Sequence, residues 1–265
     1  MSDSLSMVRR AVAAGSSVAT EHFRNDISVE SKHSQLDWVT AADEAAQARI
    51  IEVIEDLDPA AAIIGEEGEY QGTIPEDGRA WIIDPIDGTT NFVKGTSEWV
   101  VAIAIVDGST PKAGAIVAPA RNEEYFVGPA TATLNGSRLS VSGTDSVDEV
   151  VIAPIGRYTT SRAKRERFAR YVERIVTQAG DLRRFGCAQL TLCLVATGGL
   201  DAMICPFPMP PWDTVAGAYM VERAGGTVTD LQGRRWTADS DSIVATNGRV
   251  HQEVLTAFES VGVDR

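Results

Sequence analysis

The sequence predicts an α+β fold, because three kinds of pattern follow one another along its 265 residues. Apolar residues at near-helical spacing indicate two helices in the first 57 residues. Short apolar runs separated by turn residues then indicate a series of antiparallel strands. After residue 150, strands alternate with helices. We therefore expect mixed, largely antiparallel sheets in a single domain, 1–265, with two packed halves at about 1–145 and 146–265.

The first half is expected to begin with two amphipathic helices. The first extends from Leu5 to about Phe23, with a short strand from Ile27 to Val29 after it. Thr40 and Asp43 have the spacing of a capping box at the start of the second helix. Pro59 cannot continue a helix and ends it.

Strands account for most of the remaining first half. Ala61 to Ile64 leads into Gly65-Glu66-Glu67-Gly68, and Val100 to Val106 is expected to be a buried strand. Asn135-Gly136 is typical of a type I′ hairpin turn, so the neighbouring strands are antiparallel. The second half begins with a strand at Val150. Its helices are expected near residues 161–179, 187–197, 213–224 and 248–260.

Composition narrows the class of protein. With 44% hydrophobic residues the chain can bury a large core, and its formal charge of -13 argues against non-specific binding to nucleic acid or anionic membranes. Its three cysteines include no C-x-x-C pair, so neither a disulfide framework nor a zinc site is indicated. No apolar run approaches the roughly 20 residues of a membrane span. A reducing cytoplasmic location is expected.

One helix is locally basic within this acidic chain. Residues 161–178 contain several arginines, and Phe168, Val172, Ile175 and Val176 are expected to form the buried face of the helix. The charged face is either solvated or a partner surface. The three histidines, His22, His33 and His251, lack metal-ligand spacing and are expected at the surface.

The most informative stretch runs from Trp81 to Phe92. Its apolar start indicates a buried strand, which ends in two acids, Asp84 and Asp87. Carboxylates together at a strand end repel each other unless a cation neutralises them, and Mg²⁺ prefers such oxygen ligands. Gly88 permits a tight turn, and the amides of the residues after it could face a phosphate. A turn with a capping aspartate explains the D-P-x-D-G segment alone equally well.

Four other acids have ordinary alternatives. Asp43 could only stabilise the dipole of its helix, and Asp213 could be a helix N-cap. Glu66 and Glu67 could be solvated loop acids, although adjacent residues at a strand end point to different sides, so only one easily joins a common metal.

Three separated motifs together resemble the inositol monophosphatase family. They are D-P-I-D-G-T-T-N-F from Asp84, the preceding Gly65-Glu66-Glu67, and Pro211-Trp212-Asp213, which opens a helix ending in Ala224-Gly225-Gly226. The resemblance extends from about Lys32 to about Thr246. It implies a Mg²⁺-dependent phosphomonoesterase with the layered αβαβα sandwich of the sugar-phosphatase type.

The resemblance also implies a role for each site residue. Two to three Mg²⁺ ions, with Mn²⁺ as an alternative, would be held by Glu66, Asp84, the Ile86 carbonyl, Asp87 and Asp213. The catalytic residues would be Glu66, Thr89 and Asp43, the last of which completes the family pattern D-x-V-T-x-x-D. Phosphate would be bound by Gly88, Thr89 and Lys32, and the rest of the substrate by Asp87, Ala188 and Asp213.

The implied reaction is hydrolysis of a small phosphomonoester, inositol 1-phosphate first, by direct in-line attack of a metal-activated water. Alternative substrates are fructose 1,6-bisphosphate, other sugar phosphates and histidinol phosphate. A homodimer that binds a sugar or polyol phosphate, and neither nucleic acid nor membrane, is expected. The non-enzyme alternative is a regulatory protein that binds metal or phosphate without turnover.

The chain departs from the family in the loop 201–213. Inositol-specific members resemble one another in carrying an acid a few positions before the Trp-Asp pair, where it can accept hydrogen bonds from ring hydroxyls. Here Cys205 or Pro206 takes that position, and neither side chain can replace a carboxylate acceptor. Relaxed substrate specificity is therefore expected.

Overall fold

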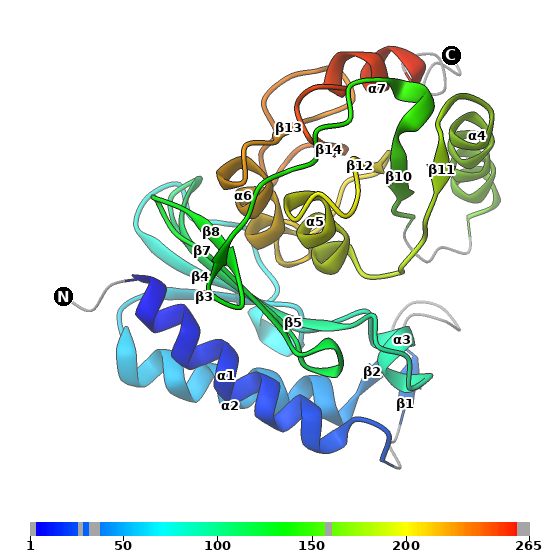
Figure 1. The fold of residues 1–265 in the computed structure, drawn as a ribbon. Helices are drawn as coiled ribbons and strands as arrows, with labels where there is room; N and C mark the ends of the chain where they lie inside the picture. Colours follow the sequence, from blue (N-terminus) through cyan, green and yellow to red (C-terminus); the bar gives the residue numbers. More distant parts are fainter. Residues whose placement is uncertain (1–3, 26–28, 32–37, 157–160, 259–265) are drawn as a thin grey trace.

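The computed structural model describes residues 4–25, 29–31, 38–156 and 161–258. These residues form five layers (Figure 1), in the order helix pair, sheet, helix pair, sheet, helix pair. The predicted αβαβα sandwich is confirmed. The helices are α1 (Ser4–His22), α2 (Ala41–Leu57), α3 (Thr89–Val93), α4 (Arg162–Gln178), α5 (Ala188–Ala196), α6 (Val215–Arg223) and α7 (His251–Phe258).

The first sheet is mostly antiparallel, as expected. Its seven strands lie in chain order, and only the first pair is parallel. They are β3 (Ala62–Gly65), β4 (Arg79–Asp87), β5 (Val100–Asp107), β6 (Thr110–Ala118), β7 (Glu123–Val127), β8 (Ala132–Leu134) and β9 (Ser137–Arg138). Asn135 and Gly136 have φ angles of 49° and 83°, so the turn between β8 and β9 has the left-handed conformations of a type I′ turn.

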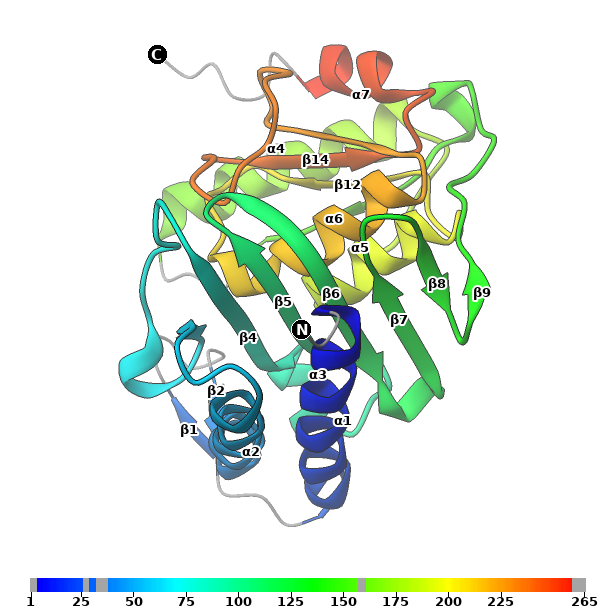
Figure 2. The same ribbon diagram turned by 90° about the vertical axis from the view of Figure 1, so that its left-hand side faces the viewer.

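The alternation of side chains along β4 explains why the sheet is covered on both faces. Trp81 and Ile83 pack in the core with α1 and α2, whereas Ala80 and Ile82 pack in the core with α5 and α6. Figure 2 shows α1 and α2 across the outer face of this sheet. Neighbouring strand residues point to opposite faces, so an uninterrupted apolar run is what a strand covered on both sides requires.

The second sheet is mixed and has the order β11-β10-β12-β14-β13. Its strands are β10 (Val151–Pro154), β11 (Asp181–Leu182), β12 (Ala202–Cys205), β13 (Thr227–Thr229) and β14 (Ile243–Thr246). The pairs on either side of β10 are parallel and those on either side of β14 are antiparallel. A separate ribbon pairs β1 (Val29–Ser31) with β2 (Trp38–Thr40), so of the strand expected at Ile27 to Val29 only Val29 is among the described residues.

The buried face of α4 differs from the prediction. Tyr171 and Ile175 are buried in it, whereas Val176 is 68% exposed. Ile175 and Val176 are consecutive and therefore about 100° apart around the helix, so a helix that packs on one side buries only one of them.

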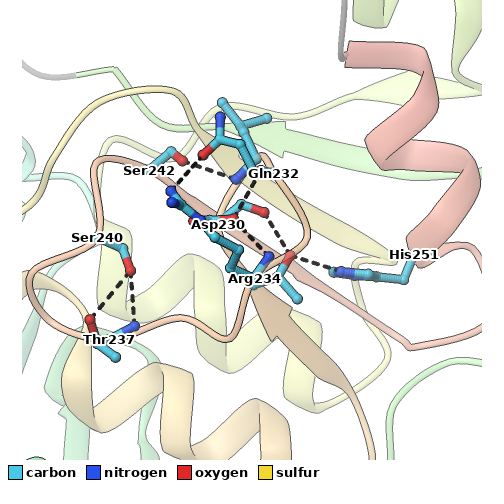
Figure 3. A network of polar contacts seen from close by, with 9 residues as sticks. Asp230, Gln232, Arg234, Thr237, Ser240, Ser242 and His251 are labelled. Atoms are coloured by element: carbon cyan, nitrogen blue, oxygen red, sulfur yellow. Dashed lines mark hydrogen bonds and ion pairs between the residues drawn. The ribbon is translucent and has the colours of Figure 1, made fainter.

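His251 is not the surface residue that its isolation in the sequence suggested. Figure 3 shows it beside a turn that Asp230 and Arg234 stabilise. Its Nδ1 and Nε2 atoms each lie 2.9 Å from a threonine hydroxyl, those of Thr246 and Thr229. Burial lowers the pKa of the imidazole. His251 therefore joins the start of α7 to two strands of the second sheet.

Candidate metal and phosphate site

The site is built where β4 ends. Asp84 is 1% exposed, and no N–H or O–H donor among the described residues bonds to either oxygen of its carboxylate. Burial, and then the charges of Glu66, Asp87 and Asp213, raise the pKa of Asp84 well above its ordinary value, and Glu66 is near enough to share a proton with it. A buried carboxylate without donors is costly, so this position calls for a cation or a proton.

Asp87 is held against the first residues of α5. Its Oδ2 atom accepts hydrogen bonds from the Gln189 amide (2.6 Å) and the Cys187 thiol (3.1 Å). Burial raises the pKa of Asp87 to about 6, although these hydrogen bonds lower it in part. Burial also raises the pKa of the Cys187 thiol well above its ordinary value, which keeps this thiol protonated and able to donate.

Gly88 makes the turn from β4 into α3. Its φ angle is 90°, and a Cβ atom there would lie 2.7 Å from the Glu98 carbonyl oxygen and 3.2 Å from the Cys187 Cβ. Both the backbone conformation and the lack of space therefore require glycine. The register of β4 and β5 shifts between Asp84 and Asp87, so the strand is irregular where the two acids stand.

Asp43 combines its ordinary role with a second contact. Its Oδ2 atom accepts hydrogen bonds from the backbone amide (2.9 Å) and hydroxyl (2.6 Å) of Thr40, which confirms the capping box. Its Oδ1 atom lies 3.5 Å from the hydroxyl of Thr89, which also lies 3.1 Å from the Ile86 carbonyl oxygen. Burial is the largest cause that raises the pKa of Asp43 to about 7. Two acceptors thus compete for one hydroxyl proton.

Glu66 and Glu67 differ in environment, as adjacent strand-end residues should. Glu67 is buried, and its backbone amide and carbonyl are both bonded to the side chain of Gln47. Glu66 is half-buried, and its charge contributes to the raised pKa values of Asp43, Asp84 and Asp87. The charge of Glu67 also raises the pKa of Asp43, but Glu66 is the glutamate whose charge acts on all three of these acids.

Asp213 is not the N-cap of α6. It ends the short 3₁₀ turn η4 (Pro211–Asp213), and Thr214 caps α6 without a side-chain hydrogen bond. The η4 turn packs beside β4, and the charge of Asp213 contributes to the raised pKa of Asp84. At the other end of α6, Gly225 has a φ of 96° and forms the expected C-terminal turn.

The structure brings together most of the predicted site residues. The Ala188 amide is also directed at Asp87 and helps to lower its pKa, whereas Lys32 lies outside the described residues. No group of three His, Cys, Asp or Glu side chains in the described part of the chain is already arranged to hold a metal ion. Asp87 is turned toward α5, where its Oδ2 atom accepts the hydrogen bond from the Gln189 amide.

Sequence reasoning missed Gln47, Cys187 and Gln189. Gln47 lies in a helix with many charged residues and Cys187 precedes α5, so neither has a clear sign in the sequence. Gln189, in the segment Ala-Gln-Leu-Thr-Leu-Cys-Leu-Val-Ala, is the clearest case, because an amide there must find hydrogen-bond partners inside the protein.

Comparisons with known proteins agree with this fold and site. The family model described as "Inositol monophosphatase family" matches residues 2–262. The chain is 34% identical to the "Fructose-1,6-bisphosphatase/inositol-1-monophosphatase" of Thermotoga maritima, over 91% of this chain and 90% of that protein. It is 32% identical to the "Nus factor SuhB" of Pseudomonas aeruginosa, over 95% and 94% of the two chains.

Solved structures show the same similarity. An IMPase from Thermotoga maritima superposes with a TM-score of 0.84 at 33% identity and covers 97% of this chain and 96% of its own. The extragenic suppressor protein suhB of Bartonella henselae superposes with a TM-score of 0.86 at 28% identity, over 96% and 97% of the two chains. Fold and site thus define a layered α+β protein with an acidic strand-end centre. The chain belongs to the inositol monophosphatase family.

Proposed function

We propose that this protein is a Mg²⁺-dependent phosphatase of small phosphomonoesters, with inositol 1-phosphate as the first candidate substrate. The observation that carries the proposal is Asp84, a fully buried carboxylate without donors that stands among three other acids. Family membership supports the same activity.

The chemistry of the acids fits Mg²⁺. All of them offer hard oxygen ligands, and the two oxygens of Asp84 have no competing donors among the described residues. We assign one ion to Glu66, Asp84 and the Ile86 carbonyl, and a second to Asp84, Asp87 and Asp213. A third, weaker ion would lie near Glu66. Bound cations would offset the repulsion of the acids, neutralise phosphate oxygens and lower the pKa of water.

The catalytic work that we assign to the chain itself concerns one water molecule. Thr89, oriented by Asp43, would accept a proton from the attacking water while its own hydroxyl proton passes to the Asp43 carboxylate, and Glu66 would help to position that water. The Thr89 hydroxyl lies 3.5 Å from the Asp43 carboxylate, within reach of a hydrogen bond, which supports this pairing. The amides of Gly88 and Thr89 would bind the phosphate, and Lys32 would add positive charge.

The substrate end of the site lacks a carboxylate acceptor at the loop position that distinguishes inositol-specific members. Cys205 ends β12 and is fully buried, with its thiol 3.6 Å from the Phe207 carbonyl oxygen, and Pro206 is buried beside it. Asp87, Ala188 and Asp213 remain for binding the alcohol portion. We therefore propose relaxed specificity that includes other sugar phosphates, and the name of the Thermotoga relative supports testing fructose 1,6-bisphosphate.

The direct test is release of inorganic phosphate from a panel of phosphomonoesters, with and without Mg²⁺. Inositol 1-phosphate, fructose 1,6-bisphosphate and histidinol phosphate belong in the panel. Mg²⁺-dependent release that is lost in Asp84→Asn supports the proposal. If the wild-type protein released no phosphate from any member of the panel at saturating Mg²⁺, the proposal would be wrong.

A regulatory role is the second candidate, because several relatives are named Nus factor SuhB. A regulatory protein would keep its function when Asp84→Asn abolishes turnover, whereas a phosphatase would not.

We further propose a cytoplasmic homodimer that is a single domain and binds neither nucleic acid nor membranes. In the described part of the chain no helix is long and apolar enough to span a bilayer, and α5 and α6 pack against both sheets.

A further inference from the structure

Two buried glutamines, one on α2 and one on α5, each bond through the side-chain amide to backbone groups beside the acidic centre. Gln47, on α2, donates from Nε2 to the Glu67 carbonyl oxygen (2.8 Å) and accepts at Oε1 from the Glu67 amide (3.0 Å). Gln189, on α5, donates to the Trp212 carbonyl oxygen (2.5 Å) and accepts from the Gly217 amide (2.8 Å). Both side chains are at least 96% buried, with exposures of 4% and 1%.

Each glutamine is bonded to the backbone next to a candidate metal-binding acid. Glu67 follows Glu66, and Trp212 precedes Asp213. Both acids come from segments other than β4 and must be held in place from outside it. Gln189 has a further role, because its own backbone amide donates to Asp87.

Glycine makes room for each side-chain amide. A Cβ atom on Gly65 would lie 2.6 Å from Oε1 of Gln47, and one on Gly217 would lie 2.8 Å from Oε1 of Gln189. Either distance is shorter than a non-bonded contact allows. The two arrangements therefore share three features, which are a buried amide, paired backbone hydrogen bonds and an adjacent glycine.

We propose that Gln47 and Gln189 are positioning residues that hold Glu66 and Asp213 at the cation sites. This inference rests on the proposed function, since it uses the same acids. Gln47 acts on the first ion through Glu66, and Gln189 acts on the second through Asp213 and Asp87. Four acids around one strand end repel one another, and hydrogen bonds to the adjacent backbone oppose their separation before a cation arrives.

The test is the binding of divalent ions to Gln47→Met and Gln189→Met, which keep an unbranched side chain but remove both hydrogen bonds. Mn²⁺ binding is counted by electron paramagnetic resonance, Mg²⁺ binding is measured by calorimetry, and the Mg²⁺ concentration for half-maximal phosphate release is determined. Replacing a residue that orients a metal ligand typically lowers metal affinity by about 10-fold to 100-fold. We expect Gln47→Met to weaken the first ion, and Gln189→Met the second, by about 10-fold or more.

Asn247→Leu is the matched control. Asn247 is a buried amide whose side chain bonds to the Thr144 carbonyl oxygen and the backbone amides of Arg249 and Val250, but it lies after β14, and its hydrogen bonds in the described part of the chain include none to Glu66, Asp84, Asp87 or Asp213. We expect Asn247→Leu to lower stability and to leave ion affinity unchanged. Normal ion binding in both methionine variants, or loss of the same ion in both, would overturn the proposal.

Two further variants provide the same test if a methionine variant does not fold. Gly65→Ala displaces the Gln47 amide without changing Gln47, and Gln189→Asn shortens the second amide beyond reach of both partners. The readouts also separate the two proposals. Weakened ion binding in a protein that hydrolyses no phosphate ester supports the positioning role and refutes the phosphatase. Normal ion binding in the variants of an active enzyme refutes the positioning role and supports the phosphatase.

Discussion

Replacing Asp84 with asparagine should make the metal-free protein more stable and the enzyme inactive. In the absence of a cation, an uncompensated buried charge costs about 3–5 kcal/mol, whereas a neutral amide without partners costs about 1–3 kcal/mol. The difference of about 2 kcal/mol favours Asp84→Asn. For a chain of this size each kcal/mol shifts the melting temperature by about 2–4 °C, so we expect an increase of about 4–8 °C in EDTA at pH 8.

Thermal unfolding in EDTA and in saturating Mg²⁺ measures how Asp84→Asn changes stability without and with the cation. Mg²⁺ should stabilise the wild-type protein more than the variant, because ligands stabilise only the state that binds them. The kcat at saturating Mg²⁺ should fall by well over 10-fold in Asp84→Asn. Retention of more than a tenth of the wild-type kcat, a loss below about 1.4 kcal/mol, would refute the assignment of this carboxylate to both ions.

Asp201→Asn is the control for this experiment. Asp201 is also buried, but its oxygens accept hydrogen bonds from the Ser142 hydroxyl (2.5 Å) and the Val151 amide (2.7 Å). Its replacement should lower stability by about 1–3 kcal/mol with or without Mg²⁺ and should leave kcat unchanged. A stability loss in EDTA for Asp84→Asn like that of Asp201→Asn would show that Asp84 is a structural acid.

Three other predictions concern the same site. Thr89→Ala and Asp43→Asn should each lower kcat with little change in KM, and their effects should not multiply in the double variant; independent effects would exclude the pairing. The pKa of Asp43 is about 7 in the folded protein and near 3.8 in the unfolded chain, so the free energy of unfolding of the metal-free protein should fall by on the order of 4 kcal/mol as the pH rises from 3.8 to about 7. The fall should be smaller in Asp43→Asn. Equal pH dependence of stability in the two proteins, measured by chemical denaturation, would contradict this. The kcat/KM for inositol 1-phosphate should exceed that for other sugar phosphates by less than about 100-fold, or about 2.7 kcal/mol, because Cys205 and Pro206 supply no acceptor; a larger preference in a substrate panel would refute this.

The sequence alone determined the features that depend on neighbours a few residues away. The Thr40 and Asp43 capping box, the Asn135-Gly136 hairpin and the turn at Gly225 all formed as predicted. Each depends on a backbone conformation and hydrogen bonds within about five residues, so composition and spacing suffice to predict it. The apolar run before Asp84 likewise predicted a buried strand, and β4 is covered on both faces.

Only the tertiary structure decided how the acids of separate motifs are held and which side chains are buried. Gln47 meets Glu67 across 20 residues, and Gln189 meets Trp212 across 23, so no local pattern indicates either contact. The exposure of Val176, the partial burial of His251 and the replacement of Asp213 by Thr214 as the N-cap also depend on what packs nearby. Sequence identifies which residues carry charge, whereas the cost of that charge, as at Asp84, depends on burial and donors that distant segments supply.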